Sequence, residues 1–237
     1  MRRLKNKAML AAKQLRFVAR KSGIKPKFVH VNVPYFSQWE SKKLVEQIVT
    51  RQIAAKDDPR WRESGAKDTD EYTSWSWSCC GMACLKMILA HKNQQIIPLV
   101  TLGKQCVKYG GYKLPLEEHP GLYYKPFVRF VKEKYGLSAK AVSALTLFEI
   151  KKTLSGGGYI IASVTPEIRF PDKNPSKHGG HVVLVFGYDD TRQVIYLHNS
   201  SGFEGSQEKV EIPYAQFKKF FDNKGILINP EVGRLRI

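Results

Sequence analysis

Apolar and polar positions along the first half of the chain recur mostly at helical spacing. Residues 41–56 open with a serine that can cap a helix, and apolar residues follow at roughly helical intervals, which predicts a helix. Residues 80–91 (CGMACLKMILAH) are apolar almost all round, with Lys86 as the exception, which predicts a helix buried between two layers. Further helices are expected over residues 98–109, 124–135 and 146–154.

The pattern changes from helical to extended at the three glycines 156–158. The runs that follow are rich in β-branched and aromatic residues and are separated by turn residues, which indicates strands. We expect strands over residues 159–164, 181–189, 193–199 and 209–213, with DDTR as a hairpin connection. A strand over residues 28–36, a helix over 214–222 and a last strand over 225–228 complete the prediction. Helices followed by strands indicate an α+β chain whose two halves share a groove.

Positive charge is concentrated near the N-terminus. The 237 residues carry a formal net charge of +18, and ten of the 39 lysines and arginines lie between Arg2 and Lys27. We interpret residues 1–27 as a basic leader helix or tail, followed by a domain of residues 28–237. Its mainly helical lobe covers residues 28–155 and its mainly β lobe residues 156–237. A solvated tail is the plainer interpretation of residues 2–27; weak contact with an anionic membrane or nucleic acid is the alternative.

The four cysteines are interpreted as free thiols. An adjacent pair in a chain of this length makes a poor disulfide framework, and the paired CxxC spacing of a zinc site is missing. No apolar run reaches the ~20 residues that span a bilayer, and no signal peptide is recognised, so a cytoplasmic location is expected. We expect no cofactor and no metal. A reactive cysteine remains possible.

Cys80 is the candidate nucleophile. It stands at the predicted start of the apolar helix, where unpaired N–H groups and the helix dipole stabilise a thiolate. Gly81 leaves room for a substrate carbonyl, and the Cys80 N–H could donate to a developing oxyanion. The neighbouring Cys79 would point about 100° away on a helix. A role as small apolar fillers is the alternative for both cysteines.

His181 and Asn199 are the candidate partners of that cysteine. His181 follows two glycines and begins a strong strand, so its position would be rigid. If the hairpin centre lies near residues 190 and 191, position 181 faces about position 200, within one residue of Asn199, whose amide oxygen could orient the imidazole. His198 competes with His181 in the same sheet. A histidine satisfied by a backbone carbonyl and an asparagine capping a turn are the structural alternatives.

Cysteine, histidine and asparagine in this order, with helices before strands, are the arrangement of a papain-type thiol hydrolase. The stretches CCGMACLKMIL, GGHVVLVFGYDD and HNSSG, together with VPYFSQW, DDPRW and GLYYKPF, resemble the C-thirty-nine family of cysteine peptidases. These are the double-glycine leader peptidases of bacteriocin exporters, and the likeness is strongest to their stand-alone bacterial branch. The resemblance spans roughly residues 31–222 and implies a papain-like fold, in which a helical lobe with the buried nucleophile helix packs on a C-terminal antiparallel sheet.

The resemblance also implies roles for single residues. It makes Cys80 the nucleophile, His181 the general base and acid, and Asn199 the orienting residue, where exporter-linked members usually have aspartate. The oxyanion glutamine of the family usually stands a few residues before the nucleophile, where this chain has Ser74, Trp75 and Ser76. Gln38 in PYFSQW matches the motif, with residues 40–77 as an insertion; a surface glutamine is the alternative.

Three functions stay open on the sequence. The first is a cysteine peptidase that cleaves a peptide or amide bond of a peptide or protein substrate through an acyl-enzyme on Cys80, with His181 as base. The second is acyl or peptidyl transfer by the same residues, with an amine in place of water. The third is a catalytically silent papain-like module that binds a peptide or an acidic partner. The sequence does not predict the oligomeric state.

Overall fold

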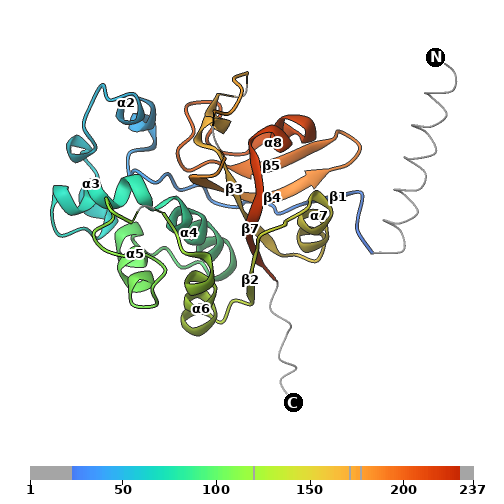
Figure 1. Ribbon diagram of the computed structural model, residues 1–237, viewed down its shortest axis with the longest axis horizontal. Coiled ribbons are helices and arrows are strands. Elements are labelled where there is room, and N and C mark those ends of the chain that lie inside the picture. Colours follow the sequence, from blue (N-terminus) through green and yellow to red (C-terminus); the bar gives the residue numbers. More distant parts are fainter. Residues whose placement is uncertain (1–22, 120, 171, 177, 230–237) are drawn as a thin grey trace, which may run out of the picture.

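The fold combines a helical lobe with an antiparallel sheet, as the sequence predicted (Figure 1). The computed structural model describes residues 23–119, 121–170, 172–176 and 178–229. The predicted leader helix falls on residues that lie, up to position 22, outside the described part. The helical lobe contains α2 (Val45–Val49), α3 (Thr69–Ser78), α4 (Cys80–Asn93), α5 (Leu99–Val107) and α6 (Tyr124–Tyr135). Short 3-10 turns cover Lys42–Leu44, Ala55–Asp57 and Trp61–Ser64.

Within the described residues, seven strands form one antiparallel sheet. They are β1 (Lys27–Val29), β2 (Ala139–Val142), β3 (Tyr159–Val164), β4 (His181–Asp189), β5 (Val194–His198), β6 (Val210–Pro213) and β7 (Phe221–Ile228). The order is β2-β7-β3-β4-β5-β6, and β1 pairs with the far end of β4. A 3-10 turn, Pro166–Arg169, follows β3, and helices α7 (Leu147–Ser155) and α8 (Tyr214–Phe220) complete the lobe. The sheet therefore places β4 between partners on both edges.

Alternate residues of β4 serve two hydrophobic cores. Val182, Leu184 and Phe186 belong to the core shared with α4, α5 and α6, because successive side chains of a strand point to opposite faces. Val183 and Val185 belong to the second core, which α7 and α8 cover. All nine residues of β4 are buried, which explains why this strand is a nearly continuous apolar run in the sequence. The helix that begins at Cys80 thus packs directly on the strand that begins at His181.

The segment before β1 contacts the sheet. Ile24 is buried in the second core, and the Pro26 carbonyl accepts a hydrogen bond from the Asp190 N–H. Gly187 allows β1 to approach, since a Cβ there would lie 2.9 Å from Val29 Cα. Residues 24–27, which the sequence analysis counted with the leader, are therefore held by the sheet in the structure.

Several elements differ from the sequence prediction. The helix expected over residues 41–56 ends at Val49. Two residues later, Arg51 takes a positive φ of 64°, which stops helical hydrogen bonding. Helix α3 was not expected, although its N-cap Asp68 accepts a hydrogen bond from the Glu71 N–H in a D-x-x-E pattern that signals a helix start. Strand β2 was also missed, because four residues carry too little periodicity. The region from Trp39 to α3 has its own small core around Val45, Ile48, Ala55 and Tyr72.

No helix within the described residues combines the length and the apolar character that crossing a bilayer requires.

Candidate active site

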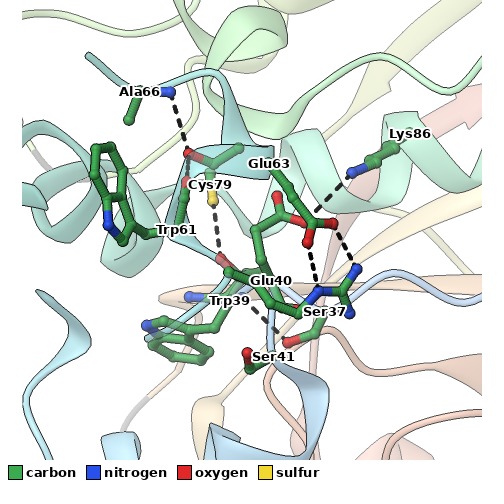
Figure 2. Close-up of polar contacts among 12 residues, drawn as sticks. Ser37, Trp39, Glu40, Ser41, Trp61, Glu63, Ala66, Cys79 and Lys86 are labelled. Carbon is green, nitrogen blue, oxygen red and sulfur yellow. Dashed lines mark hydrogen bonds and ion pairs between the residues drawn. The ribbon is translucent and has the colours of Figure 1, made fainter. Parts of the chain in front are cut away.

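Cys80 is the first residue of α4 and the more accessible of the two adjacent cysteines. Cys79 caps the helix, is fully buried and directs its Sγ at the Gln38 carbonyl oxygen, 3.6 Å away (Figure 2). Cys80 is only partly buried. A ligand or a thiol reagent can therefore reach Cys80 sooner than Cys79.

Gly81 does not provide the open space that the sequence suggested. A Cβ at this position would lie 2.6 Å from Leu122 Cδ2, so the Leu122 side chain already fills the space beside the first turn of α4. A side chain at this position would displace the end of Leu122, because the segment before α6 packs closely on the helix.

The surroundings of the Cys80 sulfur change the pKa of its thiol in opposite directions. Burial raises the pKa of the Cys80 thiol, while backbone hydrogen bonds from Val182, Gly81 and Cys80 itself oppose that rise. The contact with the Val182 backbone also locates the sulfur, because Val182 follows His181 directly in β4. The sulfur at the head of α4 therefore lies beside the first residues of β4.

His181 is buried and hydrogen-bonded to Asn199. Its Nε2 lies 2.8 Å from Asn199 Oδ1 and 3.2 Å from Ser201 Oγ. Among the described residues, the hydrogen bonds of this ring all involve Nε2. Because Oδ1 of an amide only accepts, the proton of the neutral ring is placed on Nε2, and Nδ1 keeps the lone pair of a base.

The register that brings Asn199 to His181 differs slightly from the hairpin count. Leu184 pairs with His198, and an irregularity between Val185 and Gly187 separates this pair from the pairs nearer the turn. Continued from Leu184, the register sets His181 opposite position 201 rather than 200. Ser201 therefore joins Asn199 beside the imidazole, a contact that the sequence analysis did not predict although it quoted the motif HNSSG.

The backbone around Asn199 is fixed by several hydrogen bonds. Its N–H donates to the Gln207 carbonyl at 2.7 Å, and its own carbonyl accepts from the Gly202 N–H and the Tyr35 hydroxyl. The Ser201 N–H donates to Asn199 Oδ1 at 3.2 Å. Asn199 thus both closes the turn after β5 and orients His181, so the two interpretations from the sequence describe the same geometry.

Arg169 is a charged neighbour of His181 that the sequence did not reveal. Its Nη2 donates to Ser201 Oγ at 2.8 Å, and Ser201 Oγ in turn contacts the imidazole. Burial, with the positive charge of Arg169 as the second cause, lowers the pKa of His181 to about 4, against the opposing hydrogen bond to Asn199. His181 is therefore neutral near pH 7. No sequence signal marks Arg169, because only the turn after β3 brings it there.

Gln38 lies between the two lobes at this site. It is buried; its Nε2 donates to the Ser76 carbonyl at 2.7 Å and its backbone N–H donates to the Ser200 carbonyl at 2.9 Å. Its carbonyl is the oxygen that Cys79 Sγ faces. Gln38 is therefore not a surface glutamine. It contacts the residue before Cys80 and the residue after Asn199.

His198, the competing histidine, is satisfied by the backbone. Its Nε2 lies 3.0 Å from the Val33 carbonyl oxygen, and its Nδ1 accepts from the Lys209 N–H at 3.1 Å. Both ring nitrogens are thus engaged, and the ring packs against Phe186. This side chain has no nitrogen left to act as a base.

Stability is expected to fall as the pH drops from 6.5 to 4. Burial lowers the pKa of both His181 and His198 to about 4 in the folded chain, so between these pH values the unfolded chain binds the extra protons. Each histidine then removes roughly 3 kcal/mol of unfolding free energy by pH 4. Urea unfolding followed by tryptophan fluorescence at pH 7 and pH 4.5 measures the loss. His198→Gln should show a smaller loss than the wild type; an equal loss would contradict this assignment.

Among the described residues, no group of three or more histidine, cysteine, aspartate or glutamate side chains is arranged to hold a metal ion.

Comparisons with known proteins agree with this fold. The family model described as "Peptidase_C39 like family" matches residues 30–226. Among solved structures, the crystal structure of "an putative C39-like peptidase from Bacillus anthracis" matches with a TM-score of 0.51 and 12% sequence identity, covering 86% of this chain and 98% of that chain. At this identity the match shows a shared fold. Among curated proteins, none matches the chain significantly.

Proposed function

Because the chain belongs to the peptidase C39-like family, we propose that it is a cysteine peptidase-type hydrolase acting through an acyl-enzyme on Cys80. The observation that carries the proposal is the hydrogen bond between His181 Nε2 and Asn199 Oδ1, which leaves Nδ1 as a base at the start of β4, the strand that α4 contacts. A general base needs this protonation state and a fixed ring orientation.

The proposed reaction has two steps. His181 Nδ1 takes the proton of the Cys80 thiol while the sulfur attacks the substrate carbonyl; the imidazolium then gives that proton to the leaving nitrogen as the C–N bond breaks. In the second step, His181 takes a proton from a water molecule that attacks the thioester. The imidazolium returns this proton to the Cys80 sulfur as the C–S bond breaks and the acid leaves. Because the pKa of His181 is lowered and that of Cys80 is raised, both groups are neutral before substrate binds. The proton therefore moves during the attack.

Gln38 supports the proposal as the oxyanion donor. An amide nitrogen carries two hydrogens, and the bond to the Ser76 carbonyl uses one of them. The second hydrogen is available for a developing oxyanion near the head of α4. Gln38→Ala should lower kcat by about 100-fold with little change in KM, by analogy with other oxyanion donors. Steady-state kinetics measure this split; a change confined to KM would contradict the role.

One observation favours a second function, a silent papain-like module that binds a peptide. Burial raises the pKa of the Cys80 thiol rather than lowering it, and an activated thiol normally titrates below its reference value. Acyl transfer to an amine uses the same residues as hydrolysis and differs only in the second nucleophile. A peptide or protein substrate and a cytoplasmic location stay predictions, as does contact of residues 2–27 with an anionic surface.

Labelling of the thiols separates catalysis from binding. A panel of peptides ending in an electrophilic acyl group is incubated with the wild type, Cys80→Ala and Cys79→Ala, and the modified cysteine is identified by mass spectrometry. We expect labelling of Cys80 in the wild type, its loss in Cys80→Ala and most of it kept in Cys79→Ala. Equal labelling after Cys80→Ala would overturn the proposal, and peptide binding without labelling would favour the silent module. Product analysis with added amines separates hydrolysis from transfer.

A further inference from the structure

A cavity lies beside α4, on a face of the helix other than that of Cys80. It has a volume of about 390 Å³, which is in the usual range of small-molecule sites. Glu40 and Lys86 line it together with aromatic and apolar residues, among them Phe36, Ile96 and Pro98. Lys86 follows Cys79 by seven residues, two helical turns, so it shares the face of Cys79. Cys80 and His181 do not line this cavity.

The cavity wall contains a buried carboxylate with one oxygen that lacks a hydrogen-bond partner among the described residues. The Glu40 side chain is 10% exposed, and its Oε1 has no hydrogen-bond partner among the described residues. Its Oε2 lies 3.8 Å from Lys86 Nζ, which is an ion pair but is too long for a hydrogen bond (Figure 2). Lys86 is 6% exposed, and its ammonium lies 4.7 Å from the centre of the Phe36 ring. The Glu40 carboxylate and the Lys86 ammonium are therefore buried without making a hydrogen bond to each other.

The surrounding backbone holds Glu40 in this position. The Glu40 N–H donates to the Tyr72 hydroxyl at 3.0 Å, and the Glu40 carbonyl accepts from Arg60 Nη1 at 3.4 Å. Arg60 itself is paired with Glu63 at the rim through two bonds of 2.7 and 2.5 Å. The Glu40 backbone is thus fixed and the rim charges of Arg60 and Glu63 neutralise each other, which is the arrangement of a preformed site rather than of a mobile surface pair.

The charge pattern selects the class of ligand. A cation or an anion alone would leave a net charge in a buried place, which is costly, whereas a zwitterion adds none. In an α-amino acid the ammonium nitrogen and the nearer carboxylate oxygen are about 3 Å apart, because only the N–Cα, Cα–C and C–O bonds separate them. This spacing is close to the 3.8 Å between Glu40 Oε2 and Lys86 Nζ. We propose that this cavity binds a free α-amino acid, with its ammonium on the Glu40 carboxylate, its carboxylate on Lys86 Nζ and its side chain against the apolar lining.

Matched ligands test this assignment on the folded protein. The full-length Cys80→Ala protein is screened by thermal shift with each of the twenty common L-amino acids at about 10 mM, since a ligand that binds the folded state raises Tm. The best ligand is then titrated by calorimetry beside its N-acetyl form and its amide, each of which lacks one charge. We expect both derivatives to bind at least tenfold more weakly. Equal affinity of the three, or no Tm increase with any amino acid, would overturn the proposal and indicate a cavity that holds water only.

Variants of the two charged residues provide the second arm. Glu40→Gln and Lys86→Met should each weaken binding at least tenfold, while Glu46→Gln, at an exposed position of α2 that does not line the cavity, serves as the matched control and should change it less than twofold. Where Lys86→Met fails to fold, the isosteric Glu40→Gln still decides the outcome. Unchanged affinity in Glu40→Gln would contradict the site. Since the measurements use a protein without the Cys80 thiol, their failure would leave the proposed hydrolase untouched, and the reverse also holds.

Discussion

Replacing His181 with alanine is expected to lower kcat/KM by about 10⁴-fold on whichever peptide the labelling panel selects. In the proposed reaction His181 is the base that takes the thiol proton during attack. Burial raises the pKa of the Cys80 thiol, so little thiolate is present without that base. Steady-state kinetics near pH 7 measure the effect. His178, which is exposed and three residues earlier, provides the control, because His178→Ala should leave kcat/KM within about twofold of the wild type.

A double variant tests whether the thiol and the imidazole act as a unit. Cys80→Ala should cost about as much as His181→Ala, and the combined variant should be no worse than either, because removing one partner already disables the other. Losses that multiply in the double variant would contradict a shared proton-transfer step. A kcat/KM in His181→Ala within tenfold of the wild type would remove His181 from the mechanism.

Asp58→Ala is expected to lower the unfolding free energy by about 3–5 kcal/mol. Asp58 is fully buried, and its carboxylate accepts from the Tyr72 hydroxyl at 2.5 Å and from the N–H and hydroxyl of Ser41 at 3.1 and 2.5 Å. The Arg60 N–H adds a fourth bond at 2.9 Å. Removing the carboxylate leaves these donors without a partner inside the small core between Trp39 and α3.

Urea unfolding of Asp58→Ala and of its exposed neighbour Asp57→Ala measures this difference. Asp57→Ala should stay within about 0.5 kcal/mol of the wild type, as surface substitutions usually do. Asp58→Asn keeps one acceptor and should lie between the two, which gives a measurable variant if the alanine form does not fold. Equal stability of the two alanine variants would mean that the hydrogen bonds to Asp58 contribute nothing.

The sequence predicted the sheet better than the first helical region. Strand β4 and helix α6 have the predicted bounds, because long apolar or amphipathic runs give a strong periodic signal. The elements between residues 41 and 78 do not have the predicted bounds, because polar residues and tryptophans obscure the periodic pattern there. Local hydrogen bonds such as those of Asp58 determine where this part of the chain turns. In that stretch the helix predicted over residues 41–56 is present as the shorter α2, and the D-x-x-E cap of α3 was a signal that the sequence analysis did not use.

The candidate site was predictable where chemistry and topology coincide. A cysteine at a helix start, a histidine at a strand start and an asparagine after the hairpin could be named because spacing relates them. Arg169 and Ser201 could not, since their proximity to the imidazole depends on a 3-10 turn and on the irregular register of β4 with β5. Glu40 and Lys86 form a pair only after the segment following Gln38 has folded against α4.

Strand β4 also holds the His181 imidazole in a fixed position. Its backbone is paired with β3, β5 and β1, and all nine of its side chains are buried. The β4 amide protons are therefore expected to exchange with deuterium only when the whole domain unfolds, whereas those of the short α2 exchange through local opening. If heating unfolds the helical lobe first, His181 and Asn199 stay hydrogen-bonded to each other. Refolding then has to restore only the packing of α4 on β4.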